Sequence, residues 1–368
     1  MPLKERQAIM KKIEEIRGGR TLVCFFNFDR PSEPQIRGLR TSLTSDTKEA
    51  LFRVLKETAA RRAKIDFCLY TGGGETNAVW PIISLLREYD KDFEVLVPFR
   101  CYSAGTLLAL AGKKIVMTPI SDLSPIDPST GNQFNPVDPV TPGARLVISV
   151  EDVQAYREFV HDQFKFNADE ACATRALWQP FLDRLVQNVH PIALGNVHRV
   201  HQLIKRLAKK ILGLHRTDER QVNAIIEALT SSFFSHLHMI NRHEAREILG
   251  PEQVDFASKE LTELLDELLR AHVSDFNLRK TFFLGEHLKD ELTADARFIG
   301  AAIESKKWGY LYETRARLRQ RSVFPPNVQV QIPAGQILPL VPGLKREYDV
   351  EITSLGWVRN VNPKGVTK

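Results

Sequence analysis

The feature that most constrains this chain is an alternation of short apolar runs with helix-patterned segments between residues 21 and 119. The apolar runs span residues 21–28, 65–70, 93–99 and 113–119. The helix-patterned segments between them span residues 51–63, 76–90 and 106–112. Strands and helices that alternate at this spacing predict crossover units around a buried parallel sheet. In such sheets, functional groups lie at the carboxyl ends of the strands.

Length and composition favour a globular protein. A chain of 368 residues suggests one large domain with an appendage, or two modest ones. Apolar residues make up 43% and charged residues 26%, a composition typical of globular proteins. No apolar run approaches the roughly 18 to 20 residues of a membrane span, and the first twenty residues lack a signal region, so we expect a cytoplasmic protein. The four cysteines are scattered without CxxC pairs, which predicts neither disulfides nor a cysteine zinc site.

The pattern changes along the chain and suggests three parts. Residues 119–142 are irregular and rich in proline, as in a binding surface or the wall of an active site. Helical patterns dominate residues 149–269, and short β-like pieces follow residue 322. The predicted division is a domain at 1–250, with a core at 18–150 and a helical part at 150–250, then a helical extension at 251–321 and a small β-rich appendage at 322–368.

The net charge of +6 is concentrated in residues 199–216, where six basic residues occur without an acid. Apolar residues in this segment recur at helical spacing and mark one stripe. A basic amphipathic helix is compatible with contact to nucleic acid or to an anionic membrane surface. The interpretation we favour is a core-packing helix with a solvated basic face.

Two turns carry the candidate chemistry. Ser103 stands between a strand and a helix, so its hydroxyl is exposed beside the amide of Ala104 and the positive end of the helix dipole. Residues 72–74 form a glycine loop whose amides no side chain obstructs. Together these turns resemble half of a hydrolase site. A tight turn and a helix cap are the alternative interpretations.

Two common motifs are excluded at these turns. No Gly-Lys-Ser/Thr follows Gly74, so the glycine loop is not a nucleotide phosphate loop. The serine is not in a Gly-x-Ser-x-Gly elbow, because Cys101 occupies the position of the first glycine.

The segments IDFCLYTGGGE and VPFRCYSAGTLLALAGKKIVMTPISDLSPIDPST resemble the serine dehydrogenase proteinase family. This family is a distant branch of the Clp peptidase and signal-peptide peptidase A group within the crotonase-like fold. The similarity covers most of residues 8–250, with a fainter similarity at IESKKWGYLYET. The resemblance implies an α/β fold with a Clp-peptidase-like parallel sheet, helices on its faces, a serine peptidase activity and a homo-oligomer. No cofactor and no metal are expected.

The resemblance also implies roles for individual residues. Ser103 is the expected nucleophile, and the amides of Gly73 or Gly74 with that of Ala104 are the expected oxyanion hole. Departures from the family pattern occur in the glycine loop, where Thr-Gly-Gly-Gly replaces Thr-Pro-Gly-Gly.

The expected general base is His236, oriented by Asp127 in a Ser-His-Asp triad. Leu237 replaces the family's aspartate after the histidine, and His238 takes a position that is usually aromatic, so His238 is an alternative base. A Ser-Lys dyad with a desolvated lysine is a further alternative. The candidate lysines for it are Lys113, Lys114 and Lys165.

Three functions are therefore weighed. The first is a cytoplasmic serine endopeptidase acting on polypeptides through an acyl-enzyme on Ser103. The second is a crotonase-like protein that binds an acyl ligand without peptide hydrolysis. The third is a scaffold whose basic helix or β-rich tail contacts a regulatory protein partner. Neither a nucleic-acid partner nor a membrane span is expected.

Overall fold

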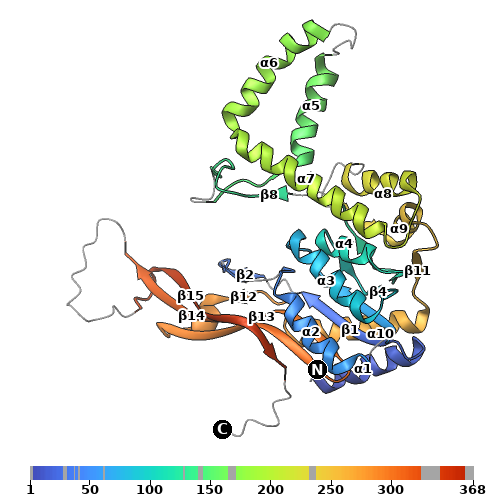
Figure 1. The fold of residues 1–368 in the computed structure, drawn as a ribbon. Coiled ribbons are helices and arrows are strands. Elements are labelled where there is room, and N and C mark those ends of the chain that lie inside the picture. The colour runs from blue at the N-terminus through green and yellow to red at the C-terminus, as the bar shows by residue number, and fades with distance from the viewer. Residues whose placement is uncertain are drawn as a thin grey trace.

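The computed structural model describes residues 3–360 apart from 28–30, 37, 40–41, 61–62, 127–128, 140–143, 165–170, 232–237 and 325–339. In this part of the chain, eight strands form one sheet in the order β11-β6-β4-β3-β1-β13-β14-β15 (Figure 1). The parallel strands are β1 (Thr21–Asn27), β3 (Ile65–Tyr70), β4 (Glu94–Val97), β6 (Ile115–Met117) and β11 (Val254–Phe256). The antiparallel strands are β13 (Thr293–Ser305), β14 (Gly309–Val323) and β15 (Lys345–Arg359). The predicted α/β class with a large parallel sheet is confirmed.

The parallel strands are apolar on both faces because helices cover both sides. In β3, Phe67 and Leu69 point to one apolar cluster, whereas Cys68 points to the other. Asp66 is the exception, and its buried carboxylate accepts hydrogen bonds from the guanidinium groups of Arg17 and Arg20. A buried charge needs such partners, and here they fix the end of the first helix against the start of the strand.

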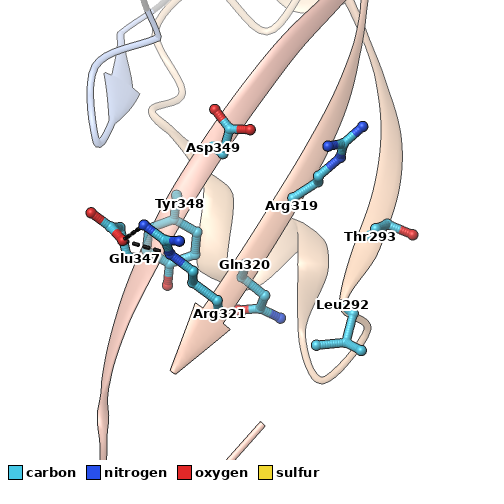
Figure 2. A pocket seen from close by; sticks show the side chains of 8 residues that line it. All are labelled: Leu292, Thr293, Arg319, Gln320, Arg321, Glu347, Tyr348 and Asp349. Carbon is cyan, nitrogen blue, oxygen red and sulfur yellow. Dashed lines mark hydrogen bonds and ion pairs between the residues drawn. The ribbon is translucent and has the colours of Figure 1, made fainter. Parts of the chain in front are cut away.

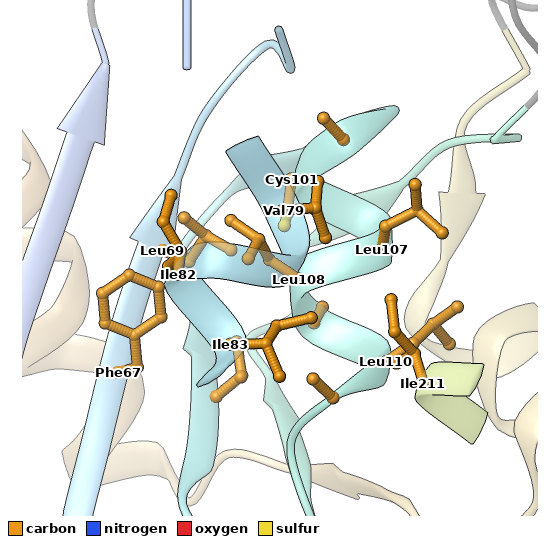
Figure 3. Packing of buried hydrophobic residues seen from close by; sticks show 14 of the residues in the cluster. Phe67, Leu69, Val79, Ile82, Ile83, Cys101, Leu107, Leu108, Leu110 and Ile211 are labelled. Carbon is orange, nitrogen blue, oxygen red and sulfur yellow. The ribbon is translucent and has the colours of Figure 1, made fainter. Parts of the chain in front are cut away.

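The helices divide between the two faces of the sheet. Those in contact with the larger apolar cluster are α2 (Thr47–Thr58), α3 (Thr76–Tyr89), α4 (Ala104–Leu110), α7 (Pro191–Leu212), α8 (Glu219–Ser231) and α9 (Arg242–Leu249). Those in contact with the second cluster are α1 (Leu3–Ile16) and α10 (Lys259–Asp275). Figure 3 shows α3 and α4 packing through Val79, Ile83 and Leu108 above the strands. This layering holds the start of α4 at the carboxyl end of the sheet.

Smaller elements complete the described fold. A three-stranded sheet contains β10 (Ile240–Asn241), β7 (Asp122–Leu123) and β5 (Arg100–Cys101). The remaining elements are β2 (Ser32–Glu33), β12 (Phe282–Phe283), β8 (Ser129–Thr130), β9 (Ile148–Ser149), α5 (Val150–Phe164), α6 (Ala171–Asn188) and α11 (Leu284–Leu288). Helices α5 and α6 project away from the sheet, and α7 returns to it (Figure 1). No helix in the described ranges is long and apolar enough to cross a membrane.

The basic segment at 199–216 lies mostly in α7, whose apolar stripe packs on the sheet side of the helix. Its basic side chains contact neighbours in the same chain. Lys205 pairs with Glu227 at 3.2 Å, and Lys209 pairs with Glu219 at 3.1 Å. Lys210 lies 3.5 Å from the centre of the Trp80 ring. These contacts support the interpretation as a core-packing helix.

The carboxyl-terminal part differs from the sequence interpretation. The predicted helical extension at 251–321 contains α10 and α11, but residues 293–305 and 309–323 are the long strands β13 and β14. In the described part of the tail at 322–368, residues 345–359 form one long strand, β15. Residues 325–339 and 361–368 lie outside the described residues, so the short β-like pieces expected there stay a prediction. Because β13 pairs with β1, these strands extend the central sheet. The division into domains itself stays a prediction.

The three long strands have one apolar and one charged face. The apolar face packs on α11 through Phe298, Leu318 and neighbouring residues. The opposite face carries charged side chains such as Arg319 on β14 and Asp349 on β15 (Figure 2). This alternation is typical of an antiparallel sheet with one solvated side.

A buried ion-pair cluster joins the first helix to β13. Arg6, 2% exposed, donates to the Glu304 carboxylate at 2.8 and 2.6 Å, and it also pairs with Asp275. His272 Nε2 lies 3.2 Å from the same carboxylate, and the His272 ring stacks on Phe26. Burial alone would raise the pKa of Glu304, but the hydrogen bonds from Arg6 and His272 outweigh it and hold this pKa at about 2.

This cluster predicts a defined acid sensitivity. The pKa of Glu304 falls from 4.5 to about 2 on folding, so the ionised carboxylate stabilises the folded state. This stabilisation is complete above pH 4.5 and is lost as the pH falls towards 2. The shift corresponds to roughly 3 kcal/mol of unfolding free energy. We expect Glu304→Gln to be less stable at neutral pH and to lose this part of the pH dependence in urea unfolding. The exposed-site control Glu263→Gln should keep the wild-type slope, and equal slopes for wild type and Glu304→Gln would contradict the assignment.

Candidate active site

Ser103 occupies a strained turn between β5 and α4. Its backbone angles are φ 52° and ψ −114°, a region that residues with a side chain rarely adopt. The side chain is half-buried, and the Ser103 carbonyl accepts the first helical hydrogen bond, from the Leu107 amide at 3.1 Å. A turn of this kind presents a hydroxyl at the amino end of a helix, where unpaired amides and the helix dipole favour negative charge. The local geometry therefore suits a nucleophile.

The glycine loop lies directly beside this serine. The Thr71 amide donates to the Arg100 carbonyl at 3.1 Å, and the Tyr102 amide donates to the Thr71 carbonyl at 3.0 Å. A Cβ atom placed on Gly73 would lie 3.0 Å from Ser103 Cβ and 3.5 Å from Ser103 Oγ. The two turns that the sequence singles out thus converge.

The amides of the expected oxyanion hole differ in their availability. The Gly73 amide donates to Thr71 Oγ1 at 3.0 Å. The bridge between Leu43 and Gly74 uses the Gly73 carbonyl and the Glu75 amide, so it leaves the Gly74 amide unused. Gly74 has no room for a side chain, because its Cβ would lie 2.2 Å from the Leu43 carbonyl oxygen.

The Ala104 amide is the first of α4 and lacks a partner within that helix. Gly105, the next residue, cannot carry a side chain, because a Cβ there would lie 2.4 Å from Thr71 Cγ2. This close approach brings the amino end of α4 onto the glycine loop. The amides of Gly74 and Ala104 are therefore the better candidates for an oxyanion hole.

A buried hydroxyl network that the sequence analysis did not identify holds the Ser103 backbone. Ser124 Oγ accepts a hydrogen bond from the Ser103 amide at 2.7 Å and donates to the Pro125 carbonyl at 2.9 Å. Thr106 Oγ1 lies 2.9 Å from the Cys101 carbonyl oxygen and 3.0 Å from that of Ser124. Both hydroxyl residues are buried, so their bonds determine the path of the chain through the turn. Ser124 belongs to the same Ser-Pro-Ile-Asp-Pro run as Asp127. This position in the run was the available sequence signal for a role of Ser124 at the site.

The two residues expected to complete the triad, His236 and Asp127, lie outside the described residues. The described residues next to Asp127 are placed close to the end of α8, because the Ile126 amide donates to the Leu229 carbonyl at 2.9 Å. Helix α8 ends at Ser231, five residues before His236. The roles of both residues stay predictions.

The alternative base His238 contacts a carboxylate. Its Nε2 lies 3.0 and 3.1 Å from the two Glu244 carboxylate oxygens, and its side chain is 37% exposed. Two residues further on, Ile240 pairs with Leu123 of β7, which in turn pairs with Cys101 of β5. The segment after His238 thus lies two strands away from the strand that precedes Ser103.

The two candidate lysines that the structure describes, Lys113 and Lys114, do not lie beside Ser103. Lys113 lies at the amino end of β4, the opposite end of the sheet from Ser103. Its side chain is 57% exposed, and its Nζ lies 3.9 Å from Asp92 Oδ2. Lys114 pairs with Asp255 at 3.2 Å at the same end, and Lys165 lies outside the described residues. A dyad base must be desolvated and adjacent to its serine, so the described lysines of this set do not fit.

Aromatic and charged groups border the turn. Burial and the neighbouring Asp122 raise the pKa of the Tyr102 hydroxyl, and burial also raises the pKa of Asp122 itself. The Arg100 guanidinium lies 5.2 Å from the centre of the Tyr70 ring. Perturbed groups of this kind cluster at functional sites, although structural networks perturb pKa values as well.

Part of the chain matches a known protein family. The family model for the ClpP-like SDH-type serine proteinases matches residues 1–140. The matched segment is less than half of the chain. The resemblance seen in the sequence is thereby confirmed for this segment.

Two uncharacterized proteins of Methanocaldococcus jannaschii are similar to the chain. One is 26% identical over 206 residues, which are 56% of this chain and 59% of the relative. The other is 26% identical over 129 residues, 35% of this chain and 44% of the relative. The matched segments thus cover less than two thirds of the length of either relative.

The segment matched by the family model contains the glycine loop, Ser103, Ser124 and Asp127, but it ends before His236 and His238. The Ser103 turn and its backbone supports therefore lie within the matched segment. Any histidine base comes from the part of the chain beyond it.

The network around Ser124 predicts the effect of a single substitution. Ser124→Ala removes the acceptor of the partly buried Ser103 amide, and we expect this to lower the free energy of unfolding by about 1–3 kcal/mol. Urea unfolding measures this loss. Ser274→Ala, at an exposed position of α10, is the matched control and should change stability by less than about 0.5 kcal/mol. Equal stability of the two variants would show that the hydroxyl does not support the turn.

Proposed function

We propose that the chain is a serine peptidase that cleaves peptide bonds through an acyl-enzyme on Ser103. One observation carries this proposal. Gly73 of the glycine loop lies directly against the strained Ser103 turn, which is at the amino end of α4. A helix cap needs neither the positive φ nor the glycine that lets the loop approach. The family match over residues 1–140 supports a peptidase of the serine type.

In the proposed mechanism, Ser103 Oγ attacks the carbonyl carbon of the substrate while His236 accepts the hydroxyl proton. Asp127 orients the imidazole and stabilises its charged form. The amides of Gly74 and Ala104 donate to the oxygen that becomes negative, and the dipole of α4 adds to this stabilisation. The imidazolium then protonates the leaving amine, and a water molecule hydrolyses the acyl-enzyme by the same sequence of proton transfers.

The proposal extends to the setting of the enzyme. We propose a polypeptide substrate, a cytoplasmic location, assembly into a homo-oligomer and control by a regulatory protein partner. Support comes from the sequence, which has the family's nucleophile motif but no motif of an unfolding ATPase. Enclosure of the site in an assembly would restrict access to unfolded chains.

Labelling with a fluorophosphonate probe tests the mechanism. We expect wild type to be labelled, Ser103→Ala to be unlabelled, and His236→Ala to react at least about 100-fold more slowly, because the general base contributes that much. Gel fluorescence over time measures the rates, and Ser274→Ala, at an exposed serine of α10, should match wild type. Equal labelling of Ser103→Ala and wild type would refute the assignment. No labelling of any variant, together with a thermal shift on adding acyl-CoA, would favour an acyl-binding protein instead.

A further inference from the structure

The outer edge of the central sheet is unusually long. Strand β15 has 15 residues, and within the described part of the chain it is the last strand of the sheet. Strands are commonly five or six residues long, and edge strands tend to be shorter. On the side away from β14, every second residue of β15 directs its N–H and C=O groups outward. These groups form a template for one more strand.

The first half of β15 has a distinct side-chain pattern. Glu347, Asp349 and Glu351 lie on the charged face of the sheet, opposite arginines of β14. Val350 and Ile352 lie on the other face, partly buried against the apolar cluster of α11. An added strand that fits this edge therefore needs basic side chains on one face and apolar side chains on the other.

Strand β14 shows which sequence satisfies that pattern. It places Arg317, Arg319 and Arg321 opposite Glu351, Asp349 and Glu347, and it places Leu318 opposite Val350. Its alternation of arginine with alanine, leucine or glutamine is thus complementary to β15 in an antiparallel register. The free edge of β15 presents the same side chains to a strand on its other side.

The carboxylates keep capacity for a further cation. Glu347 and Glu351 pair with Arg321 and Arg319 at 2.5 Å, yet they stay 54% and 52% exposed. Asp349 is exposed, and no hydrogen bond or ion pair of its side chain is found among the residues that the structure describes. Glu347 and Asp349, with Arg319 and Arg321, line a hollow of about 560 Å³ on the outer sheet. Figure 2 shows these four side chains.

A second copy of β15 fits the edge less well. The side chains of opposed residues in an antiparallel pair share a face. Two copies of β15 would pair antiparallel around a two-fold axis. With this axis at any residue from 347 to 351, a carboxylate of one copy would lie opposite a carboxylate of the other. Like charges in directly opposed positions destabilise a sheet.

We propose that the free edge of β15 binds an extended polypeptide segment in which basic residues alternate with apolar ones. The segment adds to the sheet as an antiparallel strand, with its basic side chains against Glu347, Asp349 and Glu351. Main-chain hydrogen bonds supply affinity, and the alternating side chains supply specificity. This proposal does not depend on the chemistry of Ser103, which lies on the other side of β1 in the sheet order.

The experiment uses the full chain and a labelled peptide with the sequence of residues 314–323, TRARLRQRSV. Fluorescence anisotropy measures its dissociation constant, and we expect saturable binding. Reversing the unpaired charge in Asp349→Lys should weaken binding by about ten-fold, because an attractive cross-strand pair becomes repulsive. Glu263→Lys changes the net charge equally at an exposed position of α10 and should bind as wild type does. Circular dichroism confirms that both variants are folded.

A second peptide, RRRRTALQSV, has the same composition with the arginines grouped. It should bind at least about ten-fold more weakly, because only alternation places each arginine on the acidic face. Equal binding of the two peptides, or equal binding to wild type and Asp349→Lys, would overturn the proposal in favour of unspecific charge attraction. Absence of binding would overturn it as well. A change of oligomeric state in Asp349→Lys without peptide binding would instead identify the edge as a contact between copies of the chain.

Discussion

The pairing of Thr71 with residues 100–102 is the interaction on which the candidate site depends. Its two backbone hydrogen bonds place the end of β3 beside the turn that follows β5. A shift of this pairing by one residue would turn each side chain to the other face and separate Gly73 from Ser103. The pairing is held from both sides. The packed cluster of α3 and α4 lies above it, and Thr71 Oγ1 donates to Asn27 Oδ1 at 2.9 Å on the neighbouring strand.

The strain in the Ser103 turn has identifiable supports. A non-glycine residue in such a conformation costs of the order of 1–3 kcal/mol, so the surrounding structure must compensate. The Ser124 hydroxyl accepts a hydrogen bond from the Ser103 amide. The Thr106 hydroxyl accepts one from the Ser124 amide and donates one to the carbonyl of Cys101, in the strand before the turn. The absence of side chains at Gly73 and Gly105 then lets the glycine loop and the helix approach without further strain. The turn is therefore built by its neighbours as much as by its own sequence.

The sequence was sufficient where one local pattern determines the structure. The apolar run at 65–70 is buried on both faces and became β3 with the predicted bounds, and the serine and glycine turns lie where the crossover pattern put them. The predicted helical extension at 251–321 was wrong for β13 and β14. The arginines of β14 alternate with other residues, which is a strand pattern of period two. No local pattern shows the role of Ser124, since it depends on a contact between residues 21 positions apart, and its place in the run that contains Asp127 was the available signal. His236 and Asp127 stay predictions.

The strands beyond residue 140 cover the sheet edges that the matched segment would expose by itself. The family match contains β1, β3, β4 and β6, a parallel sheet whose outer strands would be β1 and β6. In the whole chain, β13 pairs with β1 and β11 pairs with β6, so later residues cover both edges. A buried parallel sheet tolerates unpaired backbone groups poorly. The segment after residue 140 therefore completes the sheet that positions Ser103, and it transfers the exposed edge from β1 to β15, whose alternating charges suit it to solvent and to a complementary strand.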